Sequence, residues 1–164
     1  MVSLASTKKT QEQYMSSDKI SIQSPFKETA HLLDLEKLNR CHDYLRLTKH
    51  IQYYFMSDDE LLEVNLSSLG HDYYTDIITF DYSDDDDMES NEILISWDRI
   101  KENAETYKQS LKTEIHRVCF HGMLHLSGIN DKTEEEQNNM TKRENELLAL
   151  YCSTWNHEYK IRRN

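Results

Sequence analysis

The chain has 164 residues, a length that suits one domain with a buried core. Its hydrophobic fraction of 37% supports a globular fold, and no apolar run approaches the roughly 20 residues of a membrane span. The formal net charge of −11 argues against a broadly basic surface that binds nucleic acid. The three cysteines are far apart and form no C-x-x-C pair, which disfavours a disulfide framework and a thiolate zinc site. The polar N-terminus has no apolar segment of a secretory signal, so we expect a cytoplasmic protein.

The pattern of apolar residues divides the chain into an extension and one folded unit. Residues 1–17 are expected to form a flexible N-terminal extension, and residues 18–164 a single domain. Within the domain, hydrophobic periodicity predicts, in chain order, a strand near 20–22, a helix over about 25–46, a strand over 50–56, a helix to about 68, strands over 75–82 and 92–96, and helices over about 98–107, 111–127 and 133–151.

Local capping signals support three of these helix starts. Ser24 followed by Pro25 is typical of an N-cap and a first helical residue. Ser57–Glu60 and Thr133–Glu136 have the spacing of capping boxes, with acidic residues in the first turn. The acidic segment 84–87 between two strands predicts an antiparallel hairpin with a long connection. The resulting order predicts an α+β domain, in which a small four-stranded mixed sheet packs with about five helices.

Two histidines within the helix predicted over 111–127 carry the clearest chemical signal. His121 and His125 are separated by four residues, so their imidazoles lie one turn apart on the same helix face. Gly128 can end the helix in a left-handed conformation, after which Asp131 can turn back toward the histidines. Imidazole and carboxylate groups both bind zinc, and three protein ligands leave a fourth position open, which is typical of catalytic sites. A glycine inside a helix is costly, so Gly122 indicates that another backbone or a ligand approaches closely there.

Spacing alone leaves another interpretation open. A histidine pair on an apolar helix can also be two hydrogen-bonded core residues. The segment also differs from the H-E-x-x-H motif of metallopeptidases, because Gly122 stands where those enzymes have their glutamate base. Glu114 and Glu144 remain possible remote bases, although no spacing places them at the metal.

Four ordered blocks resemble the YbeY family of metal-dependent endoribonucleases, which are known as ribosomal RNA maturation factors. The blocks are the segment HGMLHLSGIND at 121–131, TDIITF at 75–80, EILIS at 92–96, and Met140, Glu144 and Leu147 in the last helix. The resemblance implies a zinc ion held by His121, His125 and Asp131. It also implies cleavage of single-stranded RNA in rRNA maturation and ribosome quality control, with the small ribosomal subunit or its assembly factors as partners.

The chain departs from the family pattern at three positions. Asp131 replaces the histidine of most members, and its charge makes a bound metal a weaker Lewis acid. Leu69 stands where the family usually has an arginine thought to hold substrate phosphate, and Asn91 replaces a glycine. The missing arginine and the net charge predict weak, strongly salt-sensitive binding of naked RNA.

Several side chains are candidates for substrate contacts. Arg117 lies one turn before His121 and is the candidate for a catalytic and phosphate-binding cation, the alternative being an exposed or ion-paired arginine. His71 and Lys132 are further candidates for substrate binding. Tyr73 and Tyr74 can stack on bases, although we expect one of the two side chains to pack in the core.

Three functions compete at this point. The first is a zinc-dependent endoribonuclease that acts on single-stranded rRNA, with one zinc or another divalent ion per chain. The second is a zinc hydrolase of peptides or small molecules. The third is a non-catalytic ribosome-assembly factor in which zinc is structural.

Overall fold

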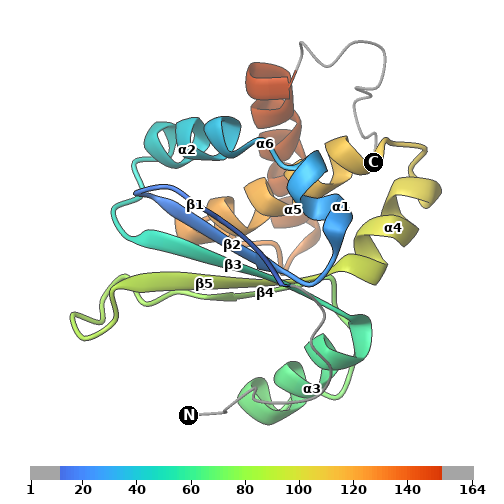
Figure 1. Ribbon diagram of the computed structural model, residues 1–164, viewed down its shortest axis with the longest axis horizontal. Coiled ribbons are helices and arrows are strands. Elements are labelled where there is room, and N and C mark those ends of the chain that lie inside the picture. Colours follow the sequence, from blue (N-terminus) through green and yellow to red (C-terminus); the bar gives the residue numbers. More distant parts are fainter. Residues whose placement is uncertain (1–11, 153–164) are drawn as a thin grey trace.

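A computed structural model describes residues 12–152 (Figure 1), and within them the chain forms one mixed sheet with helices on both faces. The five strands are β1 (Gln13–Ser16), β2 (Ile20–Ser24), β3 (His50–Met56), β4 (Ile77–Phe80) and β5 (Ser90–Ser96). Their order across the sheet is β1-β2-β3-β5-β4. The pairs β2–β3 and β3–β5 are parallel, whereas β1–β2 and β4–β5 are antiparallel. The predicted hairpin around the acidic segment is therefore confirmed.

The sheet has one strand more than the four predicted. The additional strand β1 pairs with β2 and lies within the segment that was expected to be a flexible extension. It is a four-residue edge strand with no buried residue, so its sequence carries little of the apolar alternation by which strands are predicted. Residues 13–16 of the expected extension therefore belong to the sheet. Residues 1–11 lie outside the described part of the chain.

In the described part of the chain, six helices pack with the sheet: α1 (Lys27–Leu32), α2 (Leu35–Tyr44), α3 (Asp58–Leu69), α4 (Trp97–Thr106), α5 (Leu111–Leu126) and α6 (Glu134–Cys152). The prediction of one helix over 25–46 is wrong, because the backbone is extended at Leu33 and this break separates two helices. Asp34 caps the second piece by accepting a hydrogen bond from the Lys37 amide. The predicted start at Pro25 is also wrong, since the first helix begins at Lys27 without a side-chain cap.

Both capping boxes predicted from the sequence are present. Ser57 and Glu60 exchange side-chain to backbone hydrogen bonds at the start of α3. Thr133 and Glu136 do the same before α6, with bonds of 3.1 Å in both directions. Each box satisfies two amide groups that the first helical turn leaves without a partner.

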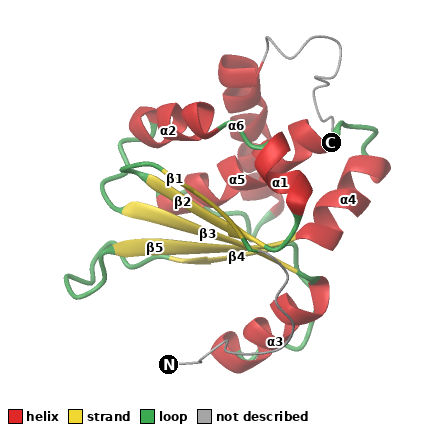
Figure 2. Cartoon of the chain, in the orientation of Figure 1, coloured by secondary structure: helices red, strands yellow, loops and turns green. Residues whose placement is uncertain are grey.

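Figures 1 and 2 show the sheet as a middle layer, with α3 on one face and α1, α2, α5 and α6 on the other. The larger core lies under the helices of the second group and includes Ile51, Tyr53 and Ile93 of the sheet. A smaller cluster, which includes Leu61 of α3 and Leu94 of β5, lies on the opposite face. Among residues 12–152, no helix is long and apolar enough to cross a membrane.

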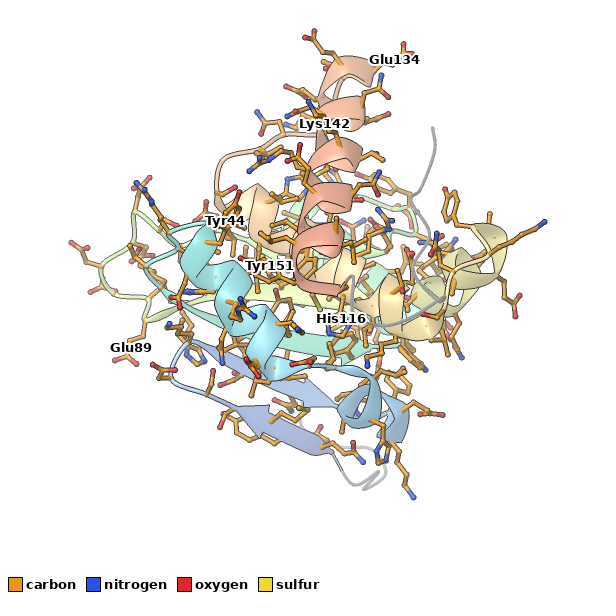
Figure 3. All side chains as sticks on the ribbon, turned by 90° about the horizontal axis from the view of Figure 1, so that it is seen from above. Tyr44, Glu89, His116, Glu134, Lys142 and Tyr151 are labelled. Atoms are coloured by element: carbon orange, nitrogen blue, oxygen red, sulfur yellow. The ribbon has the colours of Figure 1, made fainter. Side chains whose placement is uncertain are left out.

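Helix α5 is the element on which the site is built. Most of its residues are buried between the sheet and α6, which Figure 3 shows running from Glu134 to Tyr151 across the helix layer. A close approach at Gly122 is present, but the groups that meet it are side chains of the sheet and not the backbone or ligand that was predicted. A Cβ there would lie 2.7 Å from Cδ1 of Ile93 and 3.2 Å from Cδ1 of Ile77. The missing side chain lets α5 lie directly on strands β4 and β5.

Candidate metal centre

The last turn of α5 and the loop after it bring three ligand groups together. Nε2 of His121 lies 2.9 Å from Nε2 of His125. Oδ2 of Asp131 lies 3.3 Å from the first nitrogen and 3.2 Å from the second. Among the described residues, this is the group of histidine, cysteine and acidic side chains that could hold a metal ion.

The loop reverses as the glycine pattern predicts. Gly128 has a φ of +98°, and its amide donates to the carbonyl of His125. The next amide, of Ile129, donates to the carbonyl of Leu124, so the two bonds form a Schellman motif. This C-terminal cap directs the chain back along the helix end and places Asp131 over the two imidazoles.

The two other ring nitrogens fix the orientation of both histidines. Nδ1 of His125 donates to the carbonyl of Ile129 at 2.9 Å, within the same loop. Nδ1 of His121 lies 2.5 Å from Oε1 of Glu144 on α6. When both Nδ1 atoms donate, both Nε2 atoms present lone pairs to the same point.

The geometry fits a zinc ion. Ligand atoms about 2.0–2.1 Å from a tetrahedral zinc lie roughly 3.3 Å from one another, close to the three separations of 2.9–3.3 Å found here. Two unprotonated nitrogens only 2.9 Å apart also repel each other unless a cation lies between them. The side chains of His121, His125 and Asp131 remain 19%, 25% and 35% exposed, so a fourth ligand position faces solvent.

The charges around the ligands favour a cation as well. Burial alone would lower the pKa of His121, but its hydrogen bonds to Asp131 and Glu144 raise that pKa to about 10. The hydrogen bond to His121 lowers the pKa of Asp131 against the opposing effect of burial. Burial raises the pKa of Glu144, but His121 and Arg117 outweigh this effect and hold the pKa below its usual value. A protonated His121 therefore balances the carboxylates in the absence of metal, and a divalent ion would replace that proton.

Behind the ligands lies a buried ionic network that the sequence did not reveal. Glu144 is 4% exposed, and its Oε2 lies 3.1 Å from Nη1 of Arg117. Arg117 is 1% exposed and also pairs with Glu114 through Nε at 3.6 Å. The sequence analysis names Glu144 as part of a family block and as a possible remote base, and the structure places it in contact with the candidate metal ligand His121.

A phosphate-binding cation must be accessible to the substrate, whereas the Arg117 side chain is buried. The structure shows the ion-paired alternative, with the guanidinium buried and bonded to Glu144 and Asn145. Its Nη2 has no hydrogen-bond partner among the described residues, and Arg117 lines a cavity beside His121. A direct contact with substrate therefore stays a prediction.

The other candidates for substrate binding are exposed. His71 lies in the loop after α3, where its ring stacks on Tyr73 with centroids 5.2 Å apart. Tyr73 and Tyr74 are 57% and 48% exposed, so the expected core position of one of them is wrong. Lys132 is an exposed neighbour of Asp131. Neither His71 nor Lys132 lines the cavity at the ligands, and their roles stay predictions.

The solved structures include one with the same fold, the solution structure of a protein from Thermotoga maritima. It superposes with a TM-score of 0.55 and 24% identity, covering 89% of this chain and 99% of that one. A Phocaeicola vulgatus protein described as Endoribonuclease YbeY is 50% identical over 107 residues, which span 65% of this chain and 77% of the relative. One from Porphyromonas gingivalis with the same description is 38% identical over 121 residues, which span 74% and 80%.

An α+β domain whose two histidines and aspartate could hold a metal ion at an open helix end has the features expected of a single-domain metal-dependent hydrolase. Within that class, residues 6–151 match the family described as Endoribonuclease YbeY. The chain therefore belongs to this family, a family of nucleases, as the four sequence blocks predicted.

Proposed function

We propose that this protein is a zinc-dependent endoribonuclease that cleaves single-stranded RNA, and that rRNA under maturation is its substrate. The observation that carries the proposal is the set of three ligand atoms, which lie 2.9–3.3 Å apart with their orientation fixed and one side open to solvent. Family membership supplies the reaction class. The small ribosomal subunit and its assembly factors are the proposed partners.

The residues at this centre have two roles, which are to hold the ion and to position the ligands. His121, His125 and Asp131 would hold the ion, and Glu144 and the Ile129 carbonyl keep the imidazoles in position. Zinc, when bound, would polarise a phosphoryl oxygen and lower the pKa of the attacking hydroxyl or water. The exposed edge of the ligand set leaves room for a substrate phosphate, whereas structural zinc sites are closed.

The peptidase alternative loses support from the position of Gly122. A glutamate there would carry its Cβ within 2.7 Å of Cδ1 of Ile93, so the base of the H-E-x-x-H enzymes has no counterpart at this place. Chelator-sensitive cleavage of peptides, with RNA left intact, would reinstate that alternative.

Cleavage of a labelled single-stranded RNA by the zinc-loaded protein tests the proposal. The double variant His121→Ala/His125→Ala is the matched control, because it removes two ligands and leaves the rest of the surface unchanged. We expect the wild type to cleave and the variant to lose cleavage. Equal cleavage by both proteins would contradict a metal mechanism, and no cleavage by the loaded wild type would favour a non-catalytic role in ribosome assembly.

A further inference from the structure

A cavity of about 150 Å³ lies directly against the metal ligands His121 and Asp131. Its other walls come from the residue before β4 and from α5 and α6, namely Asp76, Glu114, Arg117, Val118, Gln137, Met140, Thr141 and Glu144. A cavity of about this volume holds a molecule the size of benzene, so one sugar ring fits. Exposed Gln137 at the wall leaves the cavity accessible from solvent.

The polar groups of this cavity differ in whether they already have partners. Glu144 and Glu114 are paired with Arg117. The side chains of Asp76, Gln137 and Thr141, by contrast, form no hydrogen bond or ion pair with any other residue of 12–152. The cavity therefore presents a carboxylate, an amide and a hydroxyl that are free to bind a ligand.

A buried donor gives a second, independent indication of a ligand. The Arg117 side chain is 1% exposed, and its Nη2 has no hydrogen-bond partner within residues 12–152, although Nη1 bonds both Glu144 and Asn145. A buried donor without a partner is costly. An oxygen of a molecule in the cavity would satisfy it.

Charge decides which chemistry this ligand has. The walls carry four carboxylates and only one arginine, so a second anionic group is disfavoured next to a metal-bound phosphate. A neutral group with hydroxyl donors fits, because hydroxyls donate to carboxylates and accept from arginine. Val118 and Met140 add apolar walls that can pack against the carbon face of a sugar.

From these features we propose that the cavity is the ribose subsite beside the cleaved phosphodiester, and that Asp76 accepts a hydrogen bond from the ribose 2′-hydroxyl. Acidic residues hold ribose hydroxyls in this way in dinucleotide sites, and the 2′-hydroxyl is the group by which proteins distinguish RNA from DNA. Asp76 thus makes the site selective for RNA. The inference rests on the proposed function and identifies Asp76 as the residue that distinguishes ribose from deoxyribose.

Binding of two mononucleotides to the zinc-loaded protein tests this assignment. Uridine 3′-monophosphate and its 2′-deoxy counterpart have no internucleotide bond to cleave and differ only in the hydroxyl. The measurement is the ratio of their two Kd values by calorimetry. We expect about tenfold tighter binding of the ribonucleotide by the wild type, the value of one hydrogen bond to a charged group. Asp76→Ala should bring the ratio close to one.

The ratio cancels changes of overall charge, because these affect both nucleotides alike. Asp72→Ala provides the matched control, since it removes the same charge from an exposed position of the same loop, and it should keep the tenfold ratio.

Three results would overturn the subsite: equal affinities in the wild type, no measurable binding of the ribonucleotide, or a ratio unchanged by Asp76→Ala. Melting temperatures of the variants show whether each is folded. RNA cleavage by the wild type is measured separately, so that a failure of the proposed function is distinguishable from a failure of the subsite alone.

Discussion

Oε1 of Glu144 lies 2.5 Å from Nδ1 of the proposed metal ligand His121, although the two residues are 23 positions apart and on different helices. The other oxygen of the same carboxylate binds the buried guanidinium of Arg117. One carboxylate therefore connects the ligand to a cation in the core. Such a partner fixes the tautomer and the ring orientation of a ligating histidine and raises its basicity.

Glu144→Gln should weaken zinc binding about 10- to 100-fold, the range found when the partner of a ligating histidine is replaced. Glutamine can still accept the bond from Nδ1, but it lacks the charge that makes the imidazole a stronger ligand. Competition with a chromophoric chelator measures the Kd. Glu146→Gln is the control, because it changes the same charge on the same helix at an exposed position that pairs with Arg143. Equal affinities in the two variants would show that Glu144 does not support the ligand.

Arg117→Met should lower the free energy of unfolding by about 3–5 kcal/mol, since it leaves two buried carboxylates without their cation. Those carboxylates belong to Glu144 and Glu114, at 3.1 and 3.6 Å from the guanidinium. Urea denaturation in the presence of chelator measures the change without a contribution from metal. Arg143→Met, which breaks an exposed pair with Glu146, should cost less than about 1 kcal/mol. Similar losses for both variants would contradict the importance of the buried network.

Zinc should raise the melting temperature of the wild type, because an ion bound only by the folded state stabilises it by about 2.7 kcal/mol at 100 times its Kd. For a chain of this size the shift is roughly 5–10 °C. Asp131→Ala should lose most of the shift, since two ligands hold zinc weakly. Asp131→His, which supplies another zinc-binding group, should keep it. A full shift in Asp131→Ala would show that the ion binds elsewhere.

The cluster of His121, His125 and Asp131 could be predicted from the sequence because it depends on local geometry. His121 and His125 share a helix face through their spacing, and the glycine cap at Gly128 returns the chain to them within six residues. The close approach at Gly122 could be predicted for the same reason, since a glycine within a helix is costly and needs a cause. Each of these inferences requires only neighbouring residues and known backbone preferences.

The features that the sequence did not reveal depend on contacts between distant segments. Glu144 reaches His121 only because α6 crosses α5, and the break in the helix at 33–34 coincides with a hydrogen bond from the Asp34 amide to His116, 82 positions away. Strand β1 depends on pairing with β2 rather than on an apolar pattern of its own. Periodicity describes single elements, so it contains no information on such partners.

The buried His116 should make the stability of the fold dependent on pH. Burial lowers its pKa from 6.5 to about 4. Nε2 of its ring accepts from the Asp34 amide, and Nδ1 donates to the Lys112 carbonyl at 2.7 Å, so the native state holds the neutral form. Below pH 6.5 the unfolded chain binds a proton at this residue and the folded chain does not. The contribution of His116 to stability is therefore fully present above pH 6.5 and decreases as the pH falls toward 4.

Comparison of the wild type with His116→Gln isolates this effect, because all other groups titrate in both proteins. Glutamine can make both hydrogen bonds but does not titrate. Between pH 7 and 4.5 the wild type should lose roughly 2–3 kcal/mol more of its free energy of unfolding than the variant does. Urea denaturation at the two pH values, with chelator present, measures the difference. Parallel losses would mean that His116 is protonated in the folded protein, and then the Asp34 amide must have given up its bond to the ring.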